Sequence, residues 1–277
     1  MALTLTPKTV GELLGKARNR VRQIGIELEG GWKELPPDVE LVHDGSVMFA
    51  NQTPVPDNIR TLLRSERTAD RRRGLMMEEA FYYEVGKTLP KYKGELPSPP
   101  LDPKAFPKWV GAYYPSHVNE TCGLHVHMSF NTKLTYQRLM TPLYEDAVVE
   151  WLKVWAREQG LHEDHPIWKR LNGENDYCRL GRYCADQQAL ARQKGRNRDA
   201  PVNRYTAIHY AYGLHGTIEC RILPMMEDAG MAVRAIQRLL DITNAFILTQ
   251  IKKEVMEREE IVDDGMGDGS QAIDVFI

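Results

Sequence analysis

The sequence predicts an α+β protein built on an antiparallel sheet. Two observations predict this class: short stretches of alternating apolar and polar residues lie far apart, and long helical patterns separate them without a regular βαβ order. The 277 residues, 42% of them hydrophobic, suffice for one large domain or two small ones. We expect one domain over residues 1–262, loop-rich insertions near 86–116 and 160–201, and a flexible Gly- and Asp-rich tail at 263–277.

Periodicity and turn residues predict the elements in order. Apolar residues at helical spacing predict helices, and the last of them begins at Asp228 as its N-cap. Helices are expected over 9–22, 57–80, 139–155 and 228–261. Alternating or aromatic-rich runs predict strands, which are expected over 24–32, 80–85, 122–130, 202–212 and 216–223.

The composition narrows the range of possible functions and cellular settings. A formal net charge of −2 gives no bulk attraction to nucleic acid or to an anionic membrane. No apolar run approaches the roughly 20 residues of a bilayer span, and the N-terminus lacks a secretion signal. Four cysteines without a CxxC pair argue against structural zinc and disulfides, and they predict a reducing, cytoplasmic setting; they are Cys122, Cys178, Cys184 and Cys220.

Two carboxylates stand on one face of the strand over 24–32. Residues i and i+2 of a strand share a face, so Glu27 and Glu29 lie roughly 6–7 Å apart beside Gly25. Water can cover such a face in an ordinary half-buried strand. Alternatively, a cation lies between the two carboxylates.

Two further strands repeat this arrangement. His125 and His127 share a face of the strand over 122–130, and imidazole is a common metal ligand. Glu219 and Arg221 share a face of the strand over 216–223. Glu84 occupies the same kind of position in the run over 80–85.

These faces predict a cation site if they line one cleft. Close carboxylates need a counter-charge, and mainly oxygen ligands suit Mg²⁺ or Mn²⁺ better than zinc. Arg221 could then pair with an anion such as phosphate. Metal-binding carboxylates with an arginine are typical of phosphoryl transfer.

Three motifs carry a resemblance to a known superfamily. "GLHVHMSF" (123–130) resembles the His-x-His strand of glutamine synthetases. "IELEGG" (26–31) is similar to the Glu-x-Glu strand that glutamine synthetases share with glutamate–cysteine ligases, and "TIECR" (217–221) resembles their late Glu-x-Arg strand. The amidoligase family of phages and bacteria is the nearest resemblance, because Asp44-Gly45-Ser46 matches its Asp-Gly-Ser motif.

The resemblance implies a fold, a reaction and a set of site residues. The expected fold is a curved antiparallel sheet of glutamine-synthetase-like type with long helices on its convex side, and ATP with two divalent ions on the concave side. The expected activity is ATP-dependent joining of a small-molecule or peptide carboxylate to an amine, in the cytoplasm, or in the host cytoplasm if a phage encodes the chain. The implied metal ligands are Glu27, Glu29, His125 and Glu219, with Glu84 as a further one.

The resemblance also implies roles outside the metal ligands. His127 and Ser129 would bind the nucleotide, and Arg221 would contact the transferred phosphoryl group. Asp44 is a candidate general base, although a residue beside glycine is as readily an ordinary turn residue. The acid, the amine and the oligomeric state stay open.

Three alternatives compete with the ligase. A cupin-like or zinc hydrolase site also uses His-x-His, but the glutamate expected soon after the second histidine is replaced by Phe130 and Asn131. A non-catalytic protein could bind nucleic acid or phosphate through its arginine-rich segments at 60–73 and 179–198. A degenerate structural descendant is the third alternative, and intact motifs on three strands argue against it.

Overall fold

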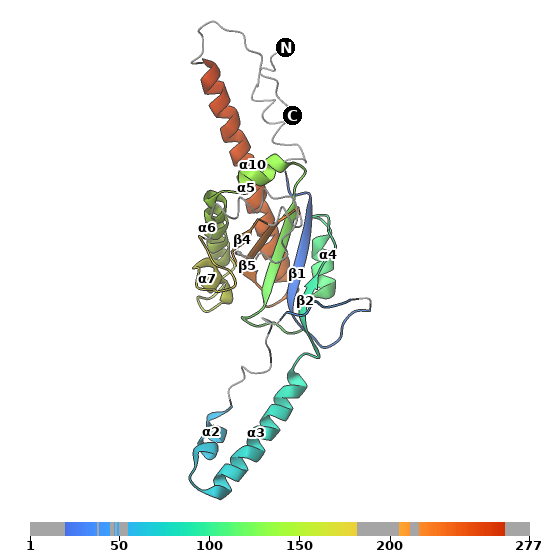
Figure 1. The fold of residues 1–277 in the computed structure, drawn as a ribbon, viewed down its shortest axis with the longest axis vertical. Helices are drawn as coiled ribbons and strands as arrows, with labels where there is room; N and C mark the ends of the chain where they lie inside the picture. Colours follow the sequence, from blue (N-terminus) through green and yellow to red (C-terminus); the bar gives the residue numbers. More distant parts are fainter. Residues whose placement is uncertain are drawn as a thin grey trace.

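A five-stranded antiparallel sheet lies at the centre of the molecule in the computed structural model (Figure 1). The structure describes residues 20–37, 39–44, 47, 49, 55–181, 205–210 and 216–263. The strand order is β2-β1-β3-β5-β4. The strands are β1 (Gln23–Trp32), β2 (Tyr92–Pro97), β3 (Gly123–Ser129), β4 (Ile208–His209) and β5 (Ile218–Pro224). The predicted α+β class and the antiparallel sheet are therefore confirmed.

Helices make up most of the remaining described chain. They are α2 (Asp57–Arg64), α3 (Thr68–Thr88), α4 (Phe106–Tyr113), α5 (Lys133–Leu139), α6 (Pro142–Glu158), α7 (Pro166–Leu171) and α10 (Ala229–Asp263). The predicted N-cap of the last helix is confirmed, because Asp228 Oδ1 accepts a hydrogen bond from the Met231 N–H at 2.8 Å. None of the described helices combines the length and apolarity that a membrane span requires.

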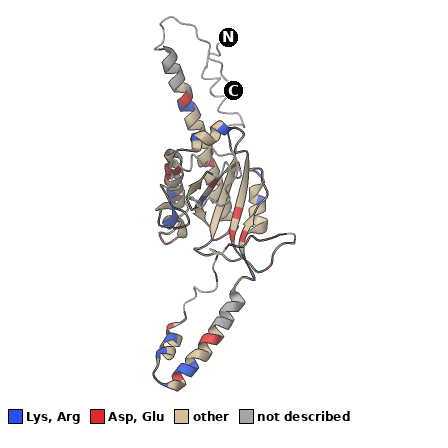
Figure 2. Cartoon of the chain, viewed as in Figure 1, with Lys and Arg blue, Asp and Glu red and all other residues tan. Residues whose placement is uncertain are grey.

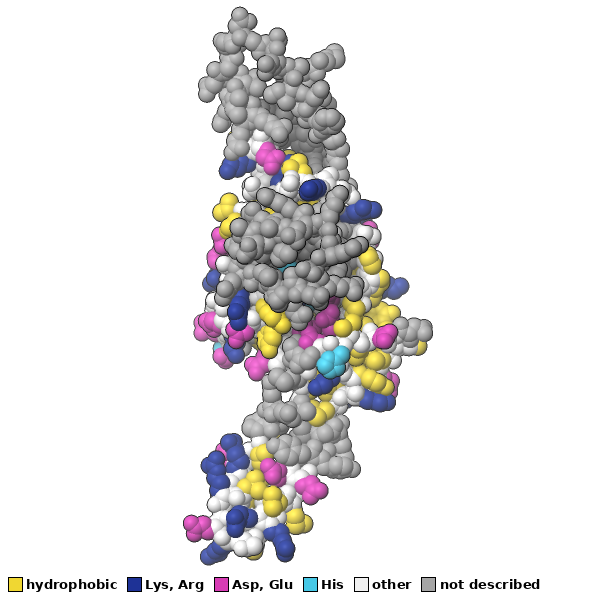
Figure 3. All heavy atoms as spheres, in the orientation of Figure 1, with side chains coloured by type: hydrophobic (Ala, Val, Ile, Leu, Met, Phe, Trp, Pro, Cys, Tyr) yellow, Lys and Arg dark blue, Asp and Glu magenta, His cyan; other side chains and the backbone are white. Residues whose placement is uncertain are grey.

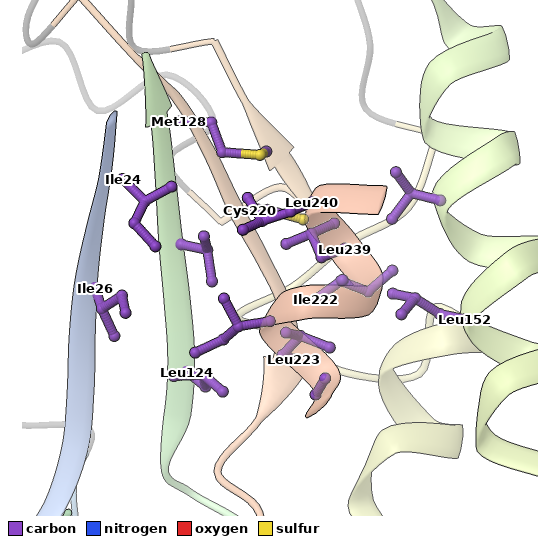
Figure 4. Packing of buried hydrophobic residues seen from close by; sticks show 14 of the residues in the cluster. Ile24, Ile26, Leu124, Met128, Leu152, Cys220, Ile222, Leu223, Leu239 and Leu240 are labelled. Atoms are coloured by element: carbon purple, nitrogen blue, oxygen red, sulfur yellow. The ribbon is translucent and has the colours of Figure 1, made fainter. Parts of the chain in front are cut away.

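The apolar residues of the strands form the core on one face of the sheet. Ile26 of β1, Val126 of β3 and Cys220 of β5 are at most 1% exposed, and the register places them side by side. Leu239 and Leu240 of α10 pack against this face (Figure 4). Burial of this surface is the main favourable contribution to folding. Because successive strand residues point to opposite faces, the polar side chains of the same strands lie on the other face of the sheet.

Two helices project from the sheet as a helical arm, which we define as α2 and α3, residues 57–88 (Figure 1). The arm corrects one prediction: residues 80–85 belong to helix α3 and not to a strand. The run "LMMEEA" before them consists of good helix formers, and a strand there would need a neighbouring strand to pair with. The aromatic residues therefore continue the helix.

The region predicted as loop at 86–116 is also corrected, since it contains β2 and α4. Its prolines stand where each element tolerates them. Pro97 ends strand β2, and Pro107 lies in the first turn of α4, where a missing N–H costs no helical hydrogen bond. Proline density alone therefore did not exclude regular structure.

Smaller differences concern the length of one strand and a short helix inside a predicted loop. The strand predicted over 202–212 is the short β4, which pairs antiparallel with β5 as expected. Helix α7 lies within the loop predicted over 160–201. Cys122, Cys178 and Cys220 are buried and free. Cys184, residues 9–19 of the helix predicted over 9–22 and the tail after Asp263 lie outside the described residues, while residues 20–22 are not helical.

Candidate metal centre

The strand register brings the predicted charged residues onto one face. Glu27 of β1 stands opposite His125 of β3, and His127 stands opposite Glu219 of β5. Glu29 stands opposite Glu95 of β2. Figure 2 shows the acidic residues of β1 and β2 close together in the sheet. Side chains from four strands, remote in the sequence, thus share one polar surface.

The first group of possible ligands joins three strands. His125 Nδ1 lies 3.0 Å from Glu27 Oε2 and 3.9 Å from Glu219 Oε1. One ligand atom from each of these three residues lies within 4.8 Å of the other two. His125 and Glu219 are buried, while Glu27 is partly exposed. Two carboxylates and one imidazole at this spacing can hold a divalent cation.

A second group lies beside the first and shares His125. Its ligand atoms belong to Glu29, Glu95 and His125 and also lie within 4.8 Å of one another. Glu29 Oε1 lies 3.4 Å from His125 Nε2. Since a neutral imidazole has only one free lone pair, His125 can serve one cation. A second cation would have to rely on carboxylate oxygens.

Glu95 is an acid of this face whose pKa is raised well above its ordinary value. Burial, together with the negative charges of Glu27, Glu29 and Asp44, raises its pKa to about 8. Asp44 belongs to a segment that pairs with β2, because Val42 and Glu95 exchange backbone hydrogen bonds of 2.8 and 3.0 Å. The end of the polar face where Glu29 and Glu95 lie, which we call the acidic end, therefore needs positive charge from a bound cation or a protonated group.

Glu27 and Glu219 are stabilised in their ionised form. Burial alone would raise the pKa of Glu27, but hydrogen bonds with His125 and His127 outweigh it and lower the pKa to about 2. Glu219 is buried as well, yet its bonds to His209 and Arg221 hold its pKa well below the ordinary value. Burial opposes protonation of His127, but its bond to Glu27 raises its pKa.

Arg221 supplies the positive charge beside these acids. Its Nη1 donates to Glu219 Oε1 at 2.5 Å, and its side chain is 15% exposed. Its Nε is buried and has no acceptor among the described residues. This buried Nε is out of reach of an entering ligand, whereas the exposed part of the guanidinium can donate to an anion in the site.

A pocket adjoins the first group at the end of the sheet where β1 begins. Its cavity volume is about 340 Å³, and Gly25, His127, Ser129 and Thr217 are among the residues that line it. His127 connects the pocket to the acids, because its Nδ1 lies 3.2 Å from Thr217 Oγ1 and its Nε2 lies 2.9 Å from Glu27 Oε1. Glu27 also lines the pocket, so a ligand there would meet the Glu27 carboxylate and the His127 ring together.

The His125 ring and the Glu29 carboxylate occupy the space that a side chain at position 123 would need. A Cβ atom there would lie 2.6 Å from His125 Nε2, closer than real Cβ contacts come, and 3.0 Å from Glu29 Oε2, which is tighter than most such contacts. The backbone N–H of Gly123 also donates to Glu29 Oε2 at 2.5 Å. The first residue of the "GLHVH" motif thus positions two possible metal ligands.

Most of the predicted site residues come together. The cluster on the polar face contains Glu27, Glu29, His125, His127, Glu219 and Arg221. Ser129 lines the pocket, and Asp44 lies near enough to Glu95 for its charge to raise the pKa of that carboxyl. Glu84 is part of helix α3 instead of the sheet, and its side chain lies outside the described residues.

The sequence prediction missed two members of the polar face. Glu95 lies in the short alternating run "YKGELP", which the surrounding prolines obscured. His209 lies in β4, and its Nδ1 is 2.9 Å from Glu219 Oε2. Alternation of Ile208, His209 and Tyr210 was the available signal.

The polar face as a whole combines groups of two chemical kinds. Four carboxylates and an imidazole can bind divalent cations, while Arg221 and the pocket can bind an anionic ligand. Comparisons of the chain with models of protein families, with curated proteins and with solved structures find no match, so the chemistry of this site rests on its own geometry.

Proposed function

We propose that this protein is an ATP-dependent carboxylate–amine ligase with a glutamine-synthetase-like sheet. One observation carries the proposal: two adjoining groups of metal-type ligands lie beside a pocket lined by His127 and Ser129. The motifs that resemble glutamine synthetases supply all of these residues except Glu95. Within the described residues, helix α10 and not a second sheet covers the apolar face, which gives no support to a cupin-like jelly roll.

The donor set fits Mg²⁺ or Mn²⁺. Glu27, Glu219 and His125 would hold one cation, while Glu29 and Glu95 would hold a second. Carboxylate oxygens dominate both groups, which favours these cations over zinc. When bound, such cations neutralise the phosphates of ATP and the developing charge of phosphoryl transfer.

The two ends of the polar face suit different ligands. The pocket at the Gln23 end would take the nucleotide, with Ser129 at its wall and His127 between the pocket and the acids. Arg221 would orient the transferred phosphoryl group through the partly exposed guanidinium that Glu219 holds in place. The carboxylate substrate would then approach from the end where Glu29 and Glu95 lie.

The proposed reaction has two steps. The substrate carboxylate attacks the γ-phosphorus of ATP, the bond to the β-phosphate oxygen breaks, and an acyl phosphate and ADP form. The amine then attacks the acyl carbon, and an amide, inorganic phosphate and a proton are released. Activation is necessary because a carboxylate has no adequate leaving group. Asp44, at the acidic end beside Glu95, is our candidate to accept the amine proton.

Trapping of the acyl phosphate by hydroxylamine tests this proposal without knowledge of the amine. The protein is incubated with ATP, Mg²⁺ or Mn²⁺, hydroxylamine and one carboxylate of a panel that contains glutamate, aspartate and oligoglutamate. We expect a hydroxamate and inorganic phosphate in equal amounts with at least one acid. Glu27→Gln and Glu219→Gln should each reduce the rate on the order of 100-fold, because they remove possible metal ligands.

A matched substitution away from the site controls for general effects. Glu158→Gln changes an exposed acid of helix α6 and should leave the rate unchanged. Near-UV circular dichroism of each variant checks the fold. Hydroxamate formation at the wild-type rate in Glu219→Gln, or no product with any acid of the panel, would contradict the proposal.

A further inference from the structure

The helical arm carries a concentrated basic surface at its far end. Residues 60–73 contain six arginines and two acidic residues, and residues 57–81 contain no lysine. All six arginines are exposed. Figure 3 shows lysine or arginine side chains around the end of the arm. The arginines are Arg60, Arg64, Arg67, Arg71, Arg72 and Arg73.

Most of this positive charge has no carboxylate partner among the residues that the structure describes. Arg60 lies 2.9 Å from Asp57, but none of the other five arginines lies within salt-bridge distance of a carboxylate in the described part of the chain. Asp70, one of the two nearby acids, accepts a hydrogen bond from Ser65 Oγ at 3.0 Å instead. The unpaired guanidinium groups are therefore available for planar, bidentate contacts with anions.

The arm is folded by its own contacts. Ile59 of α2 is 5% exposed, and Gly74 of α3 lets the two helices approach closely. A Cβ atom at Gly74 would lie 3.0 Å from the Leu63 nitrogen and 3.1 Å from the Leu62 Cβ. The two helices therefore present the arginines on a defined scaffold.

Exposed apolar side chains stand directly beside the basic surface. Leu75 is 58% exposed and Met76 is 68% exposed, and they lie four residues after Arg71 and Arg72 in helix α3. Methionine on a surface adapts to partners of varied shape. A polypeptide can offer both carboxylates and apolar side chains to such a surface, whereas a phosphate backbone offers mainly charge.

The place where the arm joins the sheet links it to the candidate site. Helix α3 ends at Thr88, and β2 begins at Tyr92 and reaches Glu95 three residues later. Tyr92 pairs with Trp32 and Glu95 pairs with Glu29, so the arm leaves the sheet at the end of β1 opposite the pocket. At 1.5 Å per residue, the 21 residues of α3 place the far end about 30 Å from this junction.

We propose that the arm binds an acidic polypeptide segment, which is the carboxylate substrate of the ligase. This inference rests on the proposed function for the reaction, but not for the binding. The arginines hold neighbouring Asp and Glu side chains of the substrate, Leu75 and Met76 contact its apolar residues, and one substrate carboxylate reaches the end of the site with Glu29 and Glu95. The substrate is therefore a polymer and not a free amino acid.

Binding of a labelled oligoglutamate peptide tests the arm directly. Fluorescence anisotropy is measured with the full chain, without ATP or metal. Arg71→Gln/Arg72→Gln/Arg73→Gln removes three charges but keeps good helix formers, and we expect affinity to fall about tenfold. Higher salt should weaken the wild-type binding in the same direction. The matched control is Lys104→Gln/Lys108→Gln/Lys133→Gln, which removes three exposed charges from the body and should not change affinity.

Two further measurements separate the possible outcomes. Leu75→Gln/Met76→Gln should also weaken oligoglutamate binding, and Glu219→Gln should bind it like the wild type. Equal affinity of the wild type and the arginine variant would overturn the arm proposal, as would tighter arginine-dependent binding of oligothymidylate than of oligoglutamate. Arm binding without any hydroxamate product would leave the arm as a binding surface and overturn the ligase instead.

Discussion

Gly123 shows how closely single residues of the candidate site fit together. Its missing side chain leaves room for the His125 ring and the Glu29 carboxylate, and its N–H holds that carboxylate. Gly25 lies on the same face of the neighbouring strand, but a Cβ atom there would meet the His127 Cβ at an ordinary contact distance of 3.4 Å. The two glycines therefore allow a matched comparison.

Gly123→Ala should weaken binding of Mn²⁺ by about tenfold or more, because the added methyl group displaces two possible ligands. Gly25→Ala adds the same methyl group near the pocket and should leave Mn²⁺ affinity within about twofold of the wild type. Isothermal titration calorimetry with Mn²⁺ measures both. Equal affinities of the two variants would show that Gly123 does not position the ligands.

At the residue scale, the sequence predicted those parts of the site that a local pattern encodes. The two-residue period of strands placed Glu27 with Glu29 and His125 with His127 on one face, and the structure agrees. Glu95 could not be found in this way, because its relation to Glu29 depends on strand pairing across 66 residues of chain. Pairing partners are decided by the whole fold and not by local propensity.

At the element scale, predictions from local propensity were wrong where strand pairing decides the structure. The run at 80–85 has strand-type residues, but it has no neighbouring strand and continues helix α3. Strand β2 has unfavourable local residues, but it gains backbone hydrogen bonds from β1 on one side and Val42 on the other. Tertiary pairing overrides local propensity in both cases.

The helical arm should be dispensable for the stability of the remaining protein. Helices α2 and α3 pack mainly on one another, and the core cluster contains none of the residues of these helices whose side chains are described. We expect replacement of residues 57–80 by a short Gly-Ser linker to change the melting temperature by less than about 3 °C. Differential scanning calorimetry measures this change. A large loss of stability would show that the arm belongs to the main cooperative unit.

For the whole molecule, repulsion between the carboxylates of the polar face makes the stability of the protein depend on pH. Hydrogen bonds with histidines stabilise the ionised form of Glu27, but Glu95 has no comparable compensation and its pKa rises to about 8. A group whose pKa is raised by folding keeps a proton that the unfolded chain releases. Its contribution to stability therefore falls as the pH rises from 4.5 toward 8.

Glu95→Gln should remove this pH dependence in the metal-free protein. With a chelator present, we expect the variant to melt at a higher temperature than the wild type at pH 8 and at a similar temperature near pH 4.5. Thermal melts across this range measure the difference, at roughly 2–4 °C per kcal/mol for a protein of about this size. Added Mn²⁺ should stabilise the wild type more than the variant. Parallel pH curves for the two proteins would contradict the assignment.

The order of the strands has a consequence for biosynthesis. Glu27 and His125 are 98 residues apart, and Glu219 and Arg221 follow only in β5, near the end of the described chain. A nascent polypeptide on the ribosome therefore cannot close this sheet until nearly all of it has been translated, and closure over such distances is slow. Until then the apolar sides of β1 and β3 have no β5 beside them. Premature termination before β5 would accordingly yield an aggregation-prone fragment and not a folded protein with an incomplete site.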